Sequence, residues 1–282
     1  MSGTLFVVAT PIGNLGDLSD RAKAVLRSVQ VVAAEDTRRA AILLQHVSAS
    51  PKTLSCHAHS PDSRLDELLE ILEQGSDVAL LTDAGSPAVS DPGPALVTLA
   101  HRAGVQVVAV PGPSAVTAAL SIAGFPADRY VFLGFPPKKG KNRSDLLEAA
   151  HRSAWTVVFF ESPERLVRLL DDLAQVCGPT REAAVLREMT KVHEECKTGT
   201  LKELAGYYQE CQPKGEVTVL LAGASEGAPD VNWVEVEERA REMLGHGSSR
   251  RDVATALVQE FSVPKREAYE FVNEIGEGGK TA

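Results

Sequence analysis

The chain has 282 residues, of which 44% are hydrophobic and 24% charged, which indicates a globular protein of two or more domains and excludes a fibrous or largely disordered chain. Its formal net charge of −9 excludes a protein that coats nucleic acid non-specifically, so any RNA contact must come from local basic patches. No apolar run reaches the roughly 18 residues of a membrane helix and no secretory leader is visible, so we expect a cytoplasmic protein without membrane contact.

Five short apolar runs within the first 113 residues are typical of buried β-strands. The expected strands are Leu5–Ala9, Val31–Ala34, Thr53–His57, Val78–Leu81 and Val105–Val110. Helical patterns alternate with these runs, which predicts the α/β fold class: a parallel, doubly wound sheet with right-handed crossovers in a domain of residues 1–113. The loops after the strands should gather along one sheet edge, where ligands bind in such folds. Those loops span 10–16, 35–38, 82–87 and 111–115.

After residue 113 the order of elements changes, and a second α/β domain with a mixed sheet is expected over residues 114–223. Its expected strands are Tyr130–Phe135, Thr156–Phe160, Ala183–Leu186, Val192–Thr198 and Val217–Ala222. Helical patterns run to Ala123 and over Ser144–His151, Glu164–Val176 and Leu201–Cys211.

A stretch rich in Gly, Ala, Ser and Pro, Gly223–Asp230, is typical of a linker. Beyond it, helical patterns without strands predict a small helical, helix-turn-helix-like domain over residues 231–282. The three expected helices are Trp233–Leu244, Arg250–Phe261 and Lys265–Ile275.

The loop that follows Val78–Leu81 combines a carboxylate, hydroxyls and a glycine that lets a ligand approach the backbone. A plain turn uses the same residue types, so this loop alone leaves both interpretations open. Nearby Ser86 and Ser114 are not set in a G-x-S-x-G sequence, which disfavours a serine hydrolase.

No metal site is expected, because Cys56, His57 and His59 have no matching group of ligands at a plausible spacing. The four cysteines are scattered without a CxxC pair, so we expect them to be reduced thiols.

Basic residues concentrate in the sequence YVFLGFPPKKGKNRS, residues 130–144, which contains no acid and carries three aromatic residues. A flexible basic loop of this kind can neutralise phosphates beside stacking faces, although exposed cations are also often just solvated. Two further basic pairs lie in the helical domain. The RNA-binding candidates are Lys138, Lys139, Lys141, Arg143, Arg250, Arg251, Lys265 and Arg266.

Seven separated motifs, in their order and spacing over Leu5–Ala222, resemble the tetrapyrrole methylase superfamily. Within it they resemble the small-subunit ribosomal RNA ribose 2′-O-methyltransferases. The motifs are ATPIGNLGDLSDRA, AAEDTR, LLTDAGSPAVSDPG, VPGPSA, FFESPERL, REMTKVHEE and GEVTVLL. The final helices are more loosely similar to that family's helix-turn-helix-like domain. One motif departs from the family pattern Tyr-Glu-x-x-His-Arg, since Phe160 and Glu164 stand at its tyrosine and histidine positions.

The resemblance implies a homodimer that binds S-adenosyl-L-methionine in the cleft between its two α/β domains. It also implies methylation of the ribose 2′-hydroxyl of a decoding-centre cytidine, cytidine 1402, in 16S rRNA of the small ribosomal subunit. The positions that match the family's cofactor contacts are Asp83, Ala84, Gly85, Pro87, Ser114, Ala115, Phe160, Leu186, Gly215 and Glu216.

The implied reaction needs in-line alignment of the hydroxyl, and a general base or a cation that lowers the hydroxyl pKa would assist it. The candidates for these roles equally fit an ion-pair network that braces the cleft. They are Asp36, Arg38, Glu161, Lys191 and Glu194.

Two other functions stay open from the sequence. One is methylation of a carbon atom of a porphyrinoid such as a precorrin, the other main substrate class of the superfamily. The other is a non-catalytic module in which the last three helices bind nucleic acid as a helix-turn-helix. The basic 138–143 segment and the extra helices favour RNA over a porphyrinoid, and the acidic balance of residues 224–282 disfavours a DNA-binding module.

Overall fold

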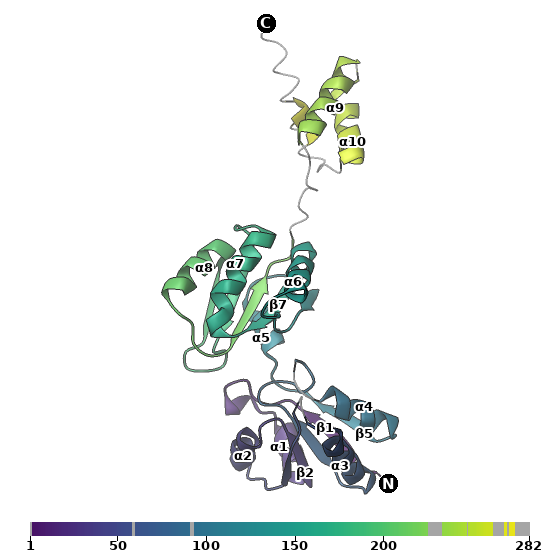
Figure 1. Ribbon diagram of the computed structural model, residues 1–282, viewed down its shortest axis with the longest axis vertical. Helices are drawn as coiled ribbons and strands as arrows, with labels where there is room; N and C mark the ends of the chain where they lie inside the picture. Colours follow the sequence, from purple (N-terminus) through teal and green to yellow (C-terminus); the bar gives the residue numbers. More distant parts are fainter. Residues whose placement is uncertain are drawn as a thin grey trace. The chain divides into compact units, whose positions relative to one another are not determined.

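The computed structural model describes residues 2–57, 60–90, 93–224, 233–246, 248–261, 268–269 and 271–273. The chain divides into two compact units, residues 1–223 and 224–282 (Figure 1). Among the described residues, no helix is long and apolar enough to cross a membrane.

The first unit begins with a five-stranded sheet in the order β3-β2-β4-β1-β5, in which every pair of neighbours is parallel. Its strands are β1 (Thr4–Val8), β2 (Val31–Ala34), β3 (Lys52–Ser55), β4 (Val78–Leu81) and β5 (Gln106–Val110). The intervening helices are α1 (Asp20–Ser28), α2 (Thr37–His46), α3 (Asp62–Glu73) and α4 (Pro94–Arg102), with a short 3-10 helix η1 (Leu15–Asp17) before α1. The predicted parallel, doubly wound sheet is confirmed.

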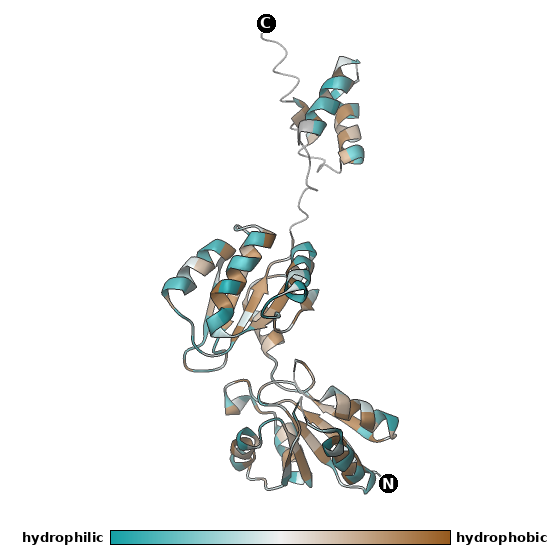
Figure 2. Ribbon diagram, in the orientation of Figure 1, coloured by the Kyte–Doolittle hydropathy of each residue, from teal (hydrophilic) through white to brown (hydrophobic). Residues whose placement is uncertain are grey.

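Both faces of this sheet are covered by helices. On β4, Ala79 and Leu81 belong to the core that α1 and α2 complete, whereas Val78 and Leu80 belong to the core of α3 and α4. Because successive side chains of a strand point to opposite faces, burial on both sides requires a continuous apolar run. Figure 2 shows the resulting apolar strands beneath helices whose outer faces are hydrophilic.

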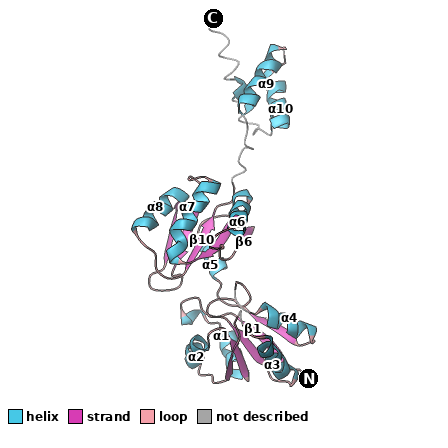
Figure 3. Ribbon diagram, in the orientation of Figure 1, coloured by secondary structure: helices cyan, strands magenta, loops and turns pink. Residues whose placement is uncertain are grey.

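The second sheet has the order β6-β7-β10-β8-β9, with β6 parallel to β7 and the other neighbours antiparallel (Figure 3). Its strands are β6 (Tyr130–Phe132), β7 (Thr156–Glu161), β8 (Glu182–Arg187), β9 (Glu195–Thr200) and β10 (Val217–Leu221). The predicted mixed sheet is confirmed. The associated helices are α5 (Ala115–Ile122), α6 (Lys141–Arg152), η2 (Pro163–Arg165), α7 (Leu166–Cys177) and α8 (Leu201–Glu210).

The basic segment departs from its prediction as a flexible loop. Helix α6 begins at Lys141 rather than near Ser144, because Gly140 adopts a φ of 85° that turns the chain into the helix. Strand β6 also ends at Phe132 instead of Phe135, since Gly134 turns the chain with a φ of 62°. Only residues 133–140 therefore form the loop before α6.

The second unit contains α9 (Trp233–Gly245) and α10 (Arg250–Phe261). The third predicted helix, Lys265–Ile275, is helical at its described residues, 268–269 and 271–273. A small apolar core of this unit includes Val236, Ala240, Val253, Ala254, Leu257, Ala268 and Val272.

Candidate functional site

The loops after β1 and β4 are joined by backbone hydrogen bonds. Thr10 N donates to Gly85 O at 2.8 Å, and Gly85 N donates to Thr10 O at 3.1 Å. The buried Thr10 hydroxyl adds a bond to Thr82 O at 3.1 Å. Gly85 has a φ of 84°, a backbone conformation that residues with a Cβ rarely adopt. The predicted gathering of strand-end loops is confirmed for this pair.

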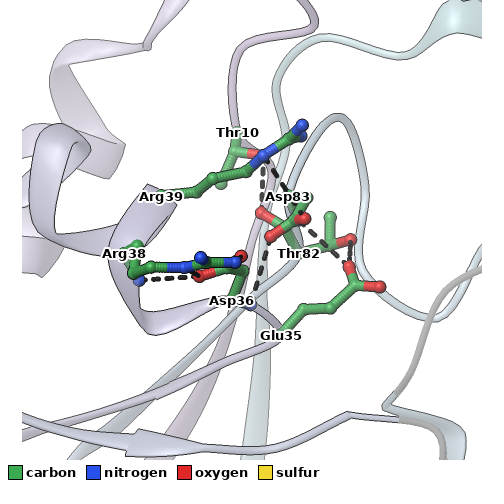
Figure 4. Close-up of polar contacts among 7 residues, drawn as sticks. All are labelled: Thr10, Glu35, Asp36, Arg38, Arg39, Thr82 and Asp83. Carbon is green, nitrogen blue, oxygen red and sulfur yellow. Dashed lines mark hydrogen bonds and ion pairs between the residues drawn. The ribbon is translucent and has the colours of Figure 1, made fainter.

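The end of β2 is tied to the same loop by side chains (Figure 4). Glu35 Oε2 accepts from Thr82 Oγ1 at 2.8 Å and from Asp83 N at 3.2 Å. Asp36 N donates to Asp83 Oδ1 at 3.1 Å, while Arg39 Nε lies 3.6 Å from Asp83 Oδ2. Burial and the nearby Glu35 carboxylate raise the pKa of Asp83, and Arg39 partly opposes this shift.

Asp36 caps the N-terminus of α2. Its carboxylate accepts from Arg38 N at 2.8 Å and forms an ion pair with the Arg38 guanidinium at 2.8 Å. These hydrogen bonds from Arg38 lower the pKa of Asp36 to about 2. The Arg38 side chain is otherwise exposed to solvent. Because Asp36 both caps α2 and pairs with Arg38, the two residues stabilise the start of α2 beside the Asp83 loop.

A cavity of about 410 Å³ is lined by loops from both sheets of the first unit. Its wall includes apolar side chains from the first sheet, such as Ile12, and from the second, such as Phe160 and Met189. Its described lining also holds four acids and one base: Glu35, Asp83, Glu161, Glu216 and Arg39. An apolar slot with a negative edge suits a ligand that is both flat and cationic.

A second cavity, of about 250 Å³, adjoins the first, because Ile12, Asp83 and Glu216 are among the residues that line both. Asp36 and Lys191 line only the smaller one. The two cavities thus offer a larger, mainly apolar compartment beside a smaller, charged one.

Lys191 is held by the turn after β8. Its Nζ lies 2.9 Å from Glu188 Oε1 and 3.7 Å from Glu216 Oε2. Burial alone would lower the pKa of Lys191, but Glu188 and Glu216 outweigh it and the pKa is raised. Gly215, in the turn before β10, has a φ of 82° that favours glycine, and a Cβ there would also displace the Glu188 carboxylate. Lys191 is therefore a fixed cation at the rim of the smaller cavity.

Glu161 ends β7 with its side chain fully buried. Its Oε1 accepts from Ser162 N at 2.8 Å, and Arg165 Nη2 lies 3.1 Å from Oε2. Burial raises the pKa of Glu161, while the Ser162 hydrogen bond and then the charges of Arg165 and Arg143 oppose the rise. Oε1 is therefore hydrogen-bonded, whereas Oε2 is buried beside the Arg165 charge and accepts no hydrogen bond from the described residues, although the residue lines the larger cavity.

Of the ten expected cofactor residues, Pro87 and Leu186 do not line the larger cavity, and Leu186 is fully buried in the core beneath α5. The eight that line it are Asp83, Ala84, Gly85, Ser114, Ala115, Phe160, Gly215 and Glu216. Among the catalytic candidates, Arg38 and Glu194 line neither cavity. Glu194 instead accepts from Thr190 N at 2.6 Å and braces the turn that carries Lys191.

The RNA-binding candidates separate into different environments. Lys138, Lys139 and Lys141 are exposed, as are Arg250 and Arg251 at the start of α10, whereas Lys265 and Arg266 lie outside the described residues. Arg143 requires a correction: it is only 5% exposed and is paired with Asp172 on α7. A guanidinium used inside the fold is not offered to a phosphate, so Arg143 does not serve as an RNA contact.

Several residues of the larger cavity were not predicted as site residues. Glu35 and Arg39 stand in the charged cluster after β2, and this position at a strand end could have identified them as site residues. Ile12 and Met189 are ordinary apolar residues of loops, and nothing local marks them. Phe135, expected only near a basic loop, lines this cavity as well. Within the described residues no cluster of three or more His, Cys, Asp or Glu side chains could hold a metal ion, and His59 lies outside them.

Comparison with known proteins gives consistent matches. The sequence profile of the tetrapyrrole (corrin/porphyrin) methylases matches residues 4–205. A Synechocystis sp. relative named ribosomal RNA small subunit methyltransferase I is 38% identical over 278 residues, covering 98% of this chain and 100% of the relative. A Thermotoga maritima relative of the same name is 43% identical over 221 residues, covering 78% of this chain and 99% of the relative.

A solved structure gives a further match at the level of the fold. Uroporphyrin-III C-methyltransferase from Thermus thermophilus, complexed with S-adenyl homocysteine, has a TM-score of 0.57 and 19% identity. The match covers 78% of this chain and 97% of that chain. This level of identity shows a shared fold and leaves the substrate to other evidence.

Proposed function

The chain belongs to the tetrapyrrole (corrin/porphyrin) methylase family, and we propose that it methylates the ribose 2′-hydroxyl of a decoding-centre cytidine in 16S rRNA, with S-adenosylmethionine as donor. The observation that carries the substrate is the identity with relatives named ribosomal RNA small subunit methyltransferase I. For one of them the match extends over nearly the whole of both chains.

The larger cavity supports the proposed cofactor. Its volume of about 410 Å³ lies within the range of small-molecule sites. Apolar residues such as Ala115 and Phe160 provide a slot for a purine, and carboxylates such as Asp83 suit the sulfonium and ammonium charges of the donor. A related methyltransferase of the same fold is complexed with S-adenyl homocysteine. We therefore propose that the eight expected residues in this cavity contact the cofactor.

S-adenosylmethionine, when bound, would supply an electrophilic methyl group: the ribose oxygen would take the methyl as its bond to sulfur breaks, S-adenosylhomocysteine would leave, and the hydroxyl proton would pass to solvent water. The chain has to hold the 2′-hydroxyl beside the cofactor cavity and stabilise its oxygen as the proton leaves. Lys191 suits the second role, because its raised pKa keeps it protonated at neutral pH. It acts as a cation there and not as a base.

The carboxylates proposed as bases fit that role less well. Asp36 has a pKa of about 2, far below the near-neutral value at which a general base works best. Glu161 accepts from Ser162 N and is paired with the Arg165 guanidinium, whose charge favours the carboxylate that is already ionised over uptake of a proton, although its Oε2 accepts no hydrogen bond within the described part of the chain. We propose that Asp36 with Arg38, and Glu161, hold the cavity walls in place, and that positioning and the Lys191 charge supply most of the catalysis.

A porphyrinoid substrate fits this site less well. The described lining of the smaller cavity, beside the proposed cofactor, holds four acids and two bases, and a polycarboxylate would be repelled by this excess of negative charge. A ribose hydroxyl is neutral and would not be repelled. Exposed cations such as Lys138 and Lys139 lie outside the cavity lining, where they could contact the backbone phosphates of a bound RNA. The acidic interior and the basic exterior together favour RNA.

We also propose a cytoplasmic homodimer. The support for a dimer is a set of exposed apolar side chains near the smaller cavity: Leu15 and Ile42 line it, and Val192, which is 95% exposed, follows Lys191. Exposed apolar groups of this kind are typical of an interface. Sedimentation velocity should give twice the monomer mass, and replacing Ile42 and Val192 with Ser should shift it toward the monomer.

The function is tested by incubating the purified protein with methyl-labelled S-adenosylmethionine and, separately, small ribosomal subunits that lack the modification or a precorrin. The proposal expects label in 16S rRNA alone. Label in the tetrapyrrole alone would contradict this proposal and identify the protein as a porphyrinoid methyltransferase.

A further inference from the structure

Phe135 is a large apolar side chain at the rim of the larger cavity. It lines the cavity and is nevertheless 56% exposed. Phenylalanine is among the residue types most often buried, and a ring left open beside a cavity gains free energy when a ligand covers it. A flat aromatic ligand is the best match to its face.

The Phe135 ring packs against the Phe160 ring, which in turn packs against the Phe132 ring. Its centroid lies 5.4 Å from that of Phe160, with the planes tilted by 58°, and Phe160 lies 4.9 Å from Phe132 in an edge-to-face arrangement. Such contacts stabilise ring positions beyond simple area burial. The ring is thus held in place before any ligand arrives.

The chain that follows Phe135 is held by a buried arginine. Arg143 Nη1 donates to Pro137 O at 2.9 Å, while its Nε and Nη2 bind Asp172 Oδ2 at 2.8 and 2.7 Å. A guanidinium presents donors in a fixed fork, so it fixes the carbonyl and the carboxylate relative to each other. Arg143 therefore anchors the basic segment to α7.

A second arginine binds the preceding carbonyl. Arg165 Nη2 donates to Pro136 O and is itself paired with the buried Glu161. Because proline fixes its own φ, two consecutive prolines with anchored carbonyls leave little freedom to the backbone. Residues 135–137 therefore form a rigid strip, of which Phe135 lines the cavity.

Two cations come directly after this strip in the sequence. Lys138 and Lys139 are exposed, and within the described part of the chain neither forms an ion pair. Exposed lysines without an acidic partner are free to neutralise phosphates. The rim thus carries an aromatic face and, beside it, unpaired positive charge.

We propose that Phe135 is the stacking platform for the base of the target nucleotide, with Lys138 and Lys139 neutralising the phosphates next to it. This inference rests on the proposed function. RNA is recognised through unstacked bases that stack on aromatic side chains, and an enzyme that modifies one nucleotide has to draw it out of its helix. A held ring beside the cofactor cavity keeps the nucleotide there while its ribose is aligned.

The test compares Phe135→Ala, Phe135→Leu and Phe135→Trp with the wild type on small subunits that lack the modification. Stacking of a base on an aromatic ring is worth about 1–3 kcal/mol, so Ala should raise KM for subunits by roughly 5- to 150-fold. Leu keeps an apolar side chain without an aromatic face and should behave like Ala, whereas Trp should stay near the wild type. Arg143→Lys, which loses the fork that holds Pro137, should raise the same KM to a smaller extent.

Calorimetric binding of S-adenosylhomocysteine is the second readout, and each variant should keep the wild-type Kd within about twofold. Tyr207→Ala is the matched control, because Tyr207 is a partly exposed aromatic on α8 that lines neither cavity of the site, and its KM should not change. The inference is overturned if Phe135→Ala keeps the wild-type KM, or if its affinity for S-adenosylhomocysteine falls by the same factor as KM rises. A wild type that does not methylate subunits would contradict the proposed function itself.

Discussion

Thr10 and Gly85 exchange two backbone hydrogen bonds although they are 75 residues apart in the sequence. This pairing joins the loop after β1 to the loop after β4 and places Asp83 and Ala84 in the wall of the larger cavity. The conformation depends on Gly85, whose φ of 84° a residue with a Cβ adopts only with strain. The proposed cofactor site is thus built on a turn that requires glycine.

Gly85→Ala should lower both stability and cofactor affinity. A Cβ at this position would make an ordinary contact, 3.6 Å from Ile12 Cγ2, so the penalty is mainly the backbone conformation, at about 1–2 kcal/mol. Relaxation of the turn should also weaken S-adenosylhomocysteine binding by roughly tenfold, equivalent to about 1.4 kcal/mol. Urea unfolding and calorimetry measure the two effects.

The matched control is Gly124→Ala. Gly124 has a similar φ of 77°, a Cβ there would meet nothing within 4 Å, and Gly124 is not among the residues that line the cavity. It should lose comparable stability and keep its affinity for S-adenosylhomocysteine. Equal loss of affinity in both variants would show that general destabilisation, and not the Gly85 turn, governs binding.

Asp36 should make the stability depend on acid pH. Its folded pKa of about 2 lies below the ordinary value of 3.8, so the folded state favours the carboxylate. The stabilisation is complete above pH of about 4 and is lost as the pH falls through about 2. Asp36→Asn keeps a good N-cap and should flatten the decline of the urea midpoint over this range, and Arg38→Gln should do the same. An unchanged slope in both variants would argue that the pair contributes nothing to folding.

Glu161→Gln should affect stability more than catalysis. The amide keeps the shape but leaves Arg165 without its anionic partner, which should cost about 1–3 kcal/mol after allowing for the partial exposure of Arg165. The single-turnover methylation rate should fall by less than roughly tenfold, below the typical contribution of a general base. Glu148→Gln, which removes an exposed ion pair with Arg152, is the stability control. A loss of more than roughly 100-fold in rate with stability retained would identify Glu161 as the base.

Lys191→Met should slow the chemical step. Removing a cation that stabilises a developing negative charge commonly lowers the rate of the chemical step by roughly 100-fold or more, and Lys191→Arg should recover part of this rate. Lys197→Met removes a lysine of β9 that lies over the Tyr207 ring and lines neither cavity, so it should keep the wild-type rate. Single-turnover rates at saturating cofactor and subunits give the comparison. A wild-type rate in Lys191→Met would assign this lysine to the ion-pair network alone.

The sequence was most informative where local pattern alone determines structure. Val78–Leu81 is buried on both faces, and its continuous apolar run therefore marked β4 correctly at both ends. The cap of α1 is a second local feature, because the Ser19 hydroxyl accepts from Ala22 N, three residues away. Signals of this kind depend on neighbours within a few residues.

Features that depend on distant partners were not visible in the sequence. Arg143 stands among exposed lysines, and only the fold brings Asp172, 29 residues away, to its guanidinium. Glu35 becomes part of the site because Thr82, 47 residues away, donates to it. Residues that belong to a charged cluster thus acquire their separate roles from tertiary contacts.

We propose above all that this protein methylates a ribose of 16S rRNA. Its most direct test is mass spectrometry of nuclease-digested 16S rRNA from cells that lack the gene, before and after their small subunits are treated with the purified protein and S-adenosylmethionine. The account predicts that treatment restores one 2′-O-methylcytidine in a fragment from the decoding centre. Fragments that remain unmethylated, or that carry the new methyl group on a base, would contradict it.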